Sequence, residues 1–217
     1  MRADVLAQMG VAHAMLQNHA ESYEAFTNAL EITPNDAELW FNRGMASRFT
    51  SRFGRSLRDF ERAAELNTTN SDLAKKLEEM LKVSRELAKD SMKLRGPDFT
   101  LDQLIEQEDL FQRGMKLMET GKWEEAERAF QAAIAMGDCL PQPWGNLGIS
   151  LIMQARYDEA EAALKRALVI DPDYTIAKNN LAMLPETRRT GPPKTIKITD
   201  PFRGSKTKQS ITFYLEE

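Results

Sequence analysis

The sequence predicts an all-α protein built from repeated pairs of helices. Alanines recur 34 residues apart in two pairs, Ala29 with Ala63 and Ala133 with Ala167. A large apolar residue lies three positions before each of these alanines, and a glycine lies nineteen positions before each. A period of this length is typical of a two-helix unit whose apolar face is buried by a stacked neighbour. We therefore expect a helical solenoid whose function is carried by one of its surfaces.

Four copies of the unit share the same linked positions. In each copy a bulky residue opens the first helix, a glycine follows four residues later, a small residue opens the packed face of the second helix, and a large apolar residue follows it. These residues are Leu6, Gly10, Ser22 and Phe26; Trp40, Gly44, Ser56 and Phe60; Leu110, Gly114, Ala126 and Phe130; and Trp144, Gly148, Ala160 and Leu164. At these positions the chain resembles the tetratricopeptide repeat family. The resemblance covers residues 3–70 and 107–174.

Several positions depart from the family pattern. His13 and Ser47 stand where the first helix usually has an aromatic residue, and Arg43 stands where a leucine is expected. Thr68 and Asp138 replace the proline that ends a repeat. These departures predict weaker packing in the N-terminal pair, residues 3–70, than in the C-terminal pair, residues 101–174.

A long helix is expected between the two pairs, within a linker of residues 71–100. Its leucines recur at helical spacing over residues 71–94, with Lys and Glu on the opposite side. Asn70 or Ser71 can cap its start, and Gly96 followed by Pro97 ends it. The linker has the length of one further repeat, so it could be a decayed third unit that has lost its second helix.

The elements of the second pair follow from capping signals. Thr100 and Gln103 have the spacing of a capping box, which predicts a first helix at residues 101–120. Gly121 and Lys122 form the turn before a second helix, which begins at Trp123 and runs to about residue 136. Residues 175–184 resemble the first helix of another repeat and are expected to cap the solenoid, stopping at Pro185.

The C-terminal tail, residues 185–217, has a different character. It holds seven Lys or Arg and four Asp or Glu, whereas the whole chain has a net charge of −4. Two stretches, 195–199 and 210–215, alternate and are rich in β-branched or aromatic residues, so a β-hairpin and a disordered end are both open. The basic tail could dock on its own acidic body, on a second copy or on another acidic partner.

The family resemblance also implies which residues face the concave groove of the solenoid. In that family the first helix of each repeat lines the groove. Carried onto this chain, the partner-binding residues are Phe41, Asn42, Met45, Phe49, Phe111, Met115, Met118, Asn146, Ile149 and Met153. Methionine and phenylalanine suit an apolar partner segment, and an asparagine amide can bond an extended backbone. The competing interpretation is that the linker helix or the tail covers several of these residues.

One family function is disfavoured by the residues present. Relatives that bind the acidic C-termini of heat-shock chaperones use lysines and asparagines in a carboxylate clamp. Ala7 and Val11 stand at those positions in the first pair, and Phe111 and Met115 stand there in the second. The charge-assisted contacts of such a clamp are therefore missing.

No catalytic, metal or cofactor motif is evident, so we expect a protein that is not an enzyme and needs no cofactor. His13 and His19 are six residues apart and do not share a helix face, and Cys139 has no histidine nearby in sequence. The acidic body disfavours nucleic acid as a partner, despite the basic tail. No run of 18 apolar residues exists, so no membrane span is expected. A single cysteine is compatible with a reducing compartment and a cytoplasmic location.

These observations predict an interaction scaffold or adaptor that binds a hydrophobic or amphipathic segment of a protein partner in its groove. Two alternatives are open. The chain could be a structural protein that forms homo-oligomers through its tail, or a regulatory repeat segment of a larger enzyme.

Overall fold

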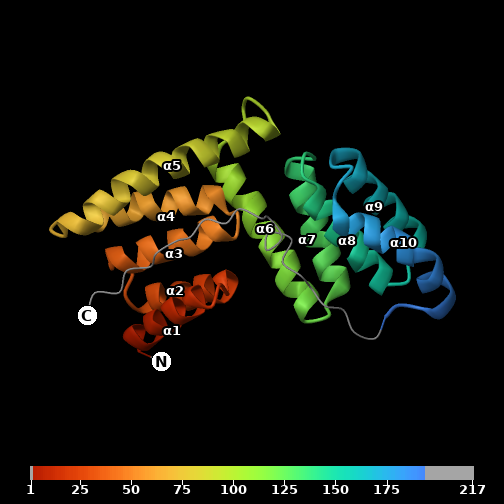
Figure 1. Ribbon diagram of the computed structural model, residues 1–217, viewed down its shortest axis with the longest axis horizontal. Helices are drawn as coiled ribbons and strands as arrows, with labels where there is room; N and C mark the ends of the chain where they lie inside the picture. Colours follow the sequence, from red (N-terminus) through yellow and green to blue (C-terminus); the bar gives the residue numbers. More distant parts are fainter. Residues whose placement is uncertain (1, 194–217) are drawn as a thin grey trace. The chain divides into compact units, whose positions relative to one another are not determined.

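Ten α-helices and no strand make up residues 2–193, the part of the chain that the computed structural model describes (Figure 1). The chain divides into two units, one extending to Lys93 and the other beginning at Leu94. The helices are α1 (Ala3–Met15), α2 (His19–Ile32), α3 (Ala37–Phe49), α4 (Phe53–Leu66), α5 (Ser71–Arg95), α6 (Leu101–Glu119), α7 (Trp123–Met136), α8 (Pro141–Met153), α9 (Tyr157–Ile170) and α10 (Thr175–Thr190).

Each unit is a row of helices in which chain neighbours pack together. In the first unit α1 contacts α2, α2 contacts α3, and α3 contacts α4; in the second unit the same order runs from α6 to α10. Helices α1, α3, α6 and α8 are the first helices of the four predicted repeats. The predicted all-α class, built from repeated pairs of helices, is confirmed.

Close contact between a glycine and a large side chain holds the two helices of each repeat together. A Cβ atom added to Gly10 or Gly44 would lie 2.7 or 2.8 Å from the ring of Phe26 or Phe60. In the second unit a Cβ at Gly114 would lie 2.5 Å from Phe130 Cε1. Gly148 has the same relation to Leu164. The glycine is therefore required because only a hydrogen atom fits between the helix backbone and the facing side chain.

The turn between the paired helices also repeats. At Gln17, Ser51, Gly121 and Ala155 the backbone has φ values of 62°, 57°, 71° and 58°. The amide of each donates to the carbonyl three residues earlier, and the next amide donates to the carbonyl five residues before it. This is the Schellman arrangement, and it needs a left-handed residue at that position. In three of the four repeats the residue at this position is not glycine.

The long helix α5 begins and ends where the sequence predicts. The Asn70 side chain accepts hydrogen bonds from the amides of Asp72 and Leu73 at 3.1 and 3.0 Å. Leu73 and Leu77 are buried in one cluster with Phe60 and Met45. Helix α5 therefore packs on the second repeat as the first helix of a further repeat would.

The second unit opens with the predicted capping box. Thr100 accepts from the amide of Gln103, whose side chain accepts from the amide of Thr100. One turn further on, Gln107 is buried and its amide donates to the carbonyls of Ala133 and Gly137 at 2.8 and 3.0 Å. Gln107 thus satisfies carbonyl groups at the end of α7, which have no partner within their own helix.

The end of α10 differs from the prediction. The helix continues past Pro185 to Thr190, so residues 185–190 are helical and do not belong to a strand-like tail. Leu184 is buried in the core, and Arg188 bonds to Asp158 and Glu161 of α9 at 2.7 and 3.0 Å. These contacts hold the last turn in place despite the hydrogen bond that Pro185 cannot donate. The helix ends at Gly191, which has a φ of 87°. The predicted hairpin stretches lie within residues 194–217, outside the described residues.

Replacing Gly114 with alanine tests the glycine contact. We expect Gly114→Ala to lower the free energy of unfolding by about 1–3 kcal/mol, since the new methyl group overlaps Phe130. In a Phe130→Ala background the same change should be neutral or stabilising, because the overlap is gone and alanine favours helix. Urea unfolding of the four proteins measures this coupling, and equal costs in both backgrounds would contradict it.

The turn residue Ala155 provides a second test. Ala155→Gly should raise the free energy of unfolding by up to about 1 kcal/mol, because glycine adopts a positive φ without the clash of a Cβ atom. The matched control is Ala162→Gly on the exposed face of α9, which should cost about 1 kcal/mol. Thermal unfolding compares the two. A loss of stability in both variants would show that the left-handed turn is not strained.

Candidate interaction surface

The predicted groove residues of the first unit all lie on α3. Phe41, Asn42 and Phe49 are half-buried, and Met45 is buried. Met45 belongs to the cluster that contains Leu73 and Leu77 of α5, and the two phenylalanines pack against it. The linker helix therefore covers part of this face, as the competing interpretation of the sequence proposed for some of these residues.

A small hollow lies beside Asn42, between α1, α2 and α3. Its lining residues are Val11, Ala14, His19, Ser22, Phe26, Asn42 and Ala46. The free volume is about 10 Å³, which is near the minimum for one water molecule. The side-chain amide of Asn42 makes no hydrogen bond to another group within residues 2–193. The hollow is therefore lined by four apolar residues and by the polar side chains of His19, Ser22 and Asn42.

His19 also lines this hollow. It is the first residue of α2, and its ring stacks on Phe49 with centroids 4.4 Å apart and an interplanar angle of 18°. The equivalent positions of the other repeats are Phe53, Trp123 and Tyr157. This aromatic recurrence was a signal in the sequence that could have identified His19 as a packed ring.

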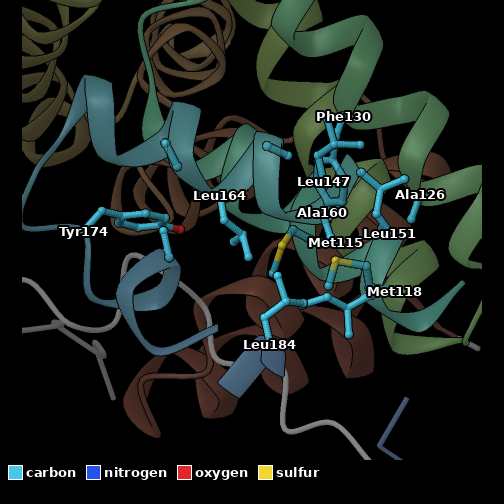
Figure 2. Packing of buried hydrophobic residues seen from close by; sticks show 14 of the residues in the cluster. Met115, Met118, Ala126, Phe130, Leu147, Leu151, Ala160, Leu164, Tyr174 and Leu184 are labelled. Carbon is cyan, nitrogen blue, oxygen red and sulfur yellow. The ribbon is translucent and has the colours of Figure 1, made fainter. Parts of the chain in front are cut away.

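In the second unit the predicted residues of α6 are buried. Phe111, Met115 and Met118 belong to one apolar cluster with residues of α7, α8 and α9. Figure 2 shows the two methionine side chains within this cluster, together with Phe130 and Leu184. The ring of Phe111 packs against Phe130 with centroids 5.8 Å apart. These side chains contribute to the core, and a partner could reach them only if the cluster opened.

The two predicted asparagines differ in their surroundings. Asn146 on α8 is 3% exposed, and its Nδ2 donates to Met115 Sδ at 3.3 Å. Asn42 is half-buried and lacks such a bond within residues 2–193. On α8 the half-buried candidates are Ile149 and Met153. Each unit therefore retains accessible candidate residues: Phe41, Asn42 and Phe49 in the first, and Ile149 and Met153 in the second.

A buried ion pair replaces a leucine contact in the second repeat. Arg43 Nε and Nη2 donate to Asp59 Oδ2 and Oδ1 at 3.0 and 2.6 Å, and Asp59 is completely buried. The guanidinium group also lies 4.4 Å from the ring centroid of Trp40. Burial raises the pKa of the Asp59 carboxyl, whereas the hydrogen bond and charge of Arg43 lower it. The pair therefore fills an apolar position of the family pattern with two charges that satisfy each other.

No group of three or more His, Cys, Asp or Glu within residues 2–193 could hold a metal ion. None of the helices there is both long enough and apolar enough to cross a lipid bilayer.

Helix pairs that pack in chain order define the class of this protein as a helical-repeat protein. Residues 111–175 match the family model described as tetratricopeptide repeat. The C-terminal pair of helix repeats therefore matches the tetratricopeptide repeat family.

Similarity to known proteins is local. The peroxisomal targeting signal receptor of Yarrowia lipolytica is 35% identical over 83 residues, which are 38% of this chain and 14% of that protein. The protein O-mannosyl-transferase TMTC1 of Mus musculus is 32% identical over 88 residues, which are 41% of this chain and 9% of that protein. Among solved structures, YrrB, a TPR protein with an unusual peptide-binding site, has 22% identity and a TM-score of 0.37 over 80% of this chain and 89% of that chain. The chain spans only a small part of the two curated relatives.

Removing one member of the Arg43 and Asp59 pair should be far more damaging than replacing both. Asp59→Ala should lower the free energy of unfolding by about 3–5 kcal/mol, because it leaves the Arg43 charge buried without that carboxylate. The double variant Arg43→Leu with Asp59→Ala carries the residues that the fourth repeat has at these positions, Leu147 and Ala163. It should be within about 1 kcal/mol of the natural protein or more stable. Urea unfolding followed by circular dichroism measures both, and a double variant as unstable as the single one would contradict this account.

Proposed function

We propose that this protein is a non-enzymatic interaction scaffold that binds an apolar or amphipathic segment of a protein partner on the inner face of its repeats. The tetratricopeptide fold and the local similarity to a peroxisomal targeting signal receptor support the general class. The primary contact surface in this proposal is the face of the first unit around Phe41, Asn42 and Phe49. Ile149 and Met153 supply the corresponding surface of the second unit.

The observation that carries the proposal is the state of Asn42. Asn42 is half-buried beside the hollow lined by Val11 and Ala14. Its side-chain amide has no protein hydrogen bond within residues 2–193. An amide has both a donor and an acceptor, so it can bond the backbone of an extended segment. Four of the residues that line the hollow are apolar, and surroundings of low dielectric would strengthen such a bond. Asn42 would therefore orient the partner, while Phe41 and Phe49 supply apolar contact area.

A repeat segment that regulates a larger enzyme is the second candidate. The local match to an O-mannosyl-transferase favours it, since the matched residues make up only 9% of that protein. Self-assembly through the tail depends on residues 194–217 and stays a prediction, as does the cytoplasmic location. The net charge of −4 disfavours nucleic acid as a partner.

Substitution of Asn42 tests the proposed surface. Asn42→Ala should reduce recovery of the bound partner about 5- to 30-fold, as expected for loss of about 1–2 kcal/mol of hydrogen bonding in a desolvated site. The measurement is quantitative mass spectrometry of proteins captured from a cell extract treated with nuclease. The matched control is Asn28→Ala, the same substitution at an exposed position of α2, which should leave recovery unchanged. Equal recovery by natural and Asn42→Ala proteins of the same thermal stability would exclude this face.

A further inference from the structure

One face of α1 carries an exposed stripe of apolar side chains. Val5, Met9, Ala12 and Leu16 recur at intervals of four, three and four residues, which places them on one side of a helix. Val5 and Met9 are 41% exposed, and Leu16 at the helix end is 71% exposed. Scattered apolar residues on a surface need no explanation, but a continuous stripe of them marks a site of interaction.

The repeat register shows what normally covers these positions. In the second repeat the equivalent residues are Leu39, Arg43, Ala46 and Thr50, and all four are buried. They lie on α3, which packs against α2, the second helix of the preceding repeat. Leu39 shares a core cluster with Phe26, Ala29 and Leu30 of α2. The stripe on α1 therefore has the position of a surface that receives the second helix of a repeat.

The other unit contains an internal comparison. Helix α6 is also the first repeat helix of its unit, and its residues at these positions are Asp109, Arg113, Lys116 and Thr120. Arg113, Lys116 and Thr120 are exposed, and Asp109 is half-buried. The same chain thus uses polar residues at this position of one unit and apolar residues in the other. Solenoid ends that face water require a polar surface, so α1 has the composition of a face that is covered.

From this comparison we infer that the Val5, Met9, Ala12 and Leu16 stripe of α1 is a docking site for an amphipathic α-helix of a partner protein. The helix would lie on α1 as α2 lies on α3. Its contacting residues would follow the pattern of three of the four second repeat helices, in which a large apolar residue is followed three positions later by alanine and then by leucine or isoleucine. In this chain that pattern is Phe26, Ala29 and Leu30; Phe130, Ala133 and Ile134; and Leu164, Ala167 and Leu168. This site is separate from the inner face around Asn42.

A partner helix fits this face better than a second copy of the chain. Specific protein dimers usually bury about 800 Å² on each partner, which corresponds to about 20–30 residues. Three of the four stripe residues lie on α1, a helix of 13 residues, and the fourth, Leu16, is the C-cap of that helix. A single helix laid in the repeat geometry matches this length, as the 14-residue α2 matches α3.

The test uses a peptide with the sequence of α2, residues 19–32, stapled on its exposed face and labelled with a fluorophore. Anisotropy should show saturable binding to the full chain. The deciding variant carries the α6 residues on α1: Val5→Asp, Met9→Arg, Ala12→Lys and Leu16→Thr. Because all four residues project into solvent, the variant should keep its thermal stability and lose at least tenfold in affinity.

The control variant carries Val169→Thr and Met183→Lys, which alter exposed apolar residues of α9 and α10, and it should bind the peptide as the natural chain does. Absence of binding to the natural chain, or equal binding to the α1 variant, would overturn the inference. Light scattering gives a further outcome: a natural chain that is dimeric and an α1 variant that is monomeric would show that a second copy covers the stripe, which also overturns it. The Asn42→Ala variant should bind the stapled peptide normally, so this site and the inner face can fail independently.

Discussion

The packing of a large side chain directly against a glycine backbone is the contact on which each repeat depends. Gly114 faces Phe130 so closely that a methyl group on the glycine would overlap the ring. The close approach packs the first and second helices of a repeat directly against each other and buries the large side chain completely. Ala133, one turn beyond Phe130, is also fully buried. This explains why the glycine, the large residue and the alanine recur together in the sequence.

The turn geometry follows from the same constraint. Two helices can meet at the glycine only if the chain reverses within a few residues, and the Schellman arrangement achieves this with one left-handed residue. Gly121 adopts that conformation readily, whereas Ala155 does so at a cost in backbone strain. The persistence of the turn with alanine, serine or glutamine shows that packing between the helices outweighs the local preference. The unit is therefore specified mainly by contacts between helices, and the turn adapts to them.

The sequence predicted the helices well and the exposure of individual side chains poorly. Repeat spacing and capping residues located α5, α6 and α7, because these signals act over a few residues. Pro185 predicts the end of α10, but contacts of Leu184 and Arg188 with other helices extend the helix. Asn146 was expected to face a partner and instead donates to Met115 Sδ. Whether a groove position is open depends on which side chains fill the groove, and a family register does not contain that information.

The loss of one glycine explains why the first unit ends at α5. Residues 34 positions after Gly44 and Phe60 are Glu78 and Leu94, and the alanine position is Pro97. Glutamate at the contact point excludes a second helix at close range, and proline cannot continue one. Helix α5 keeps the apolar residues that pack on the second repeat, Leu73 and Leu77, but Glu78 is exposed. A repeat can thus be reduced to one helix that covers its neighbour on one side and presents charge on the other. Helix α1 has the opposite arrangement, because its packed side faces α2 and its outer side is apolar.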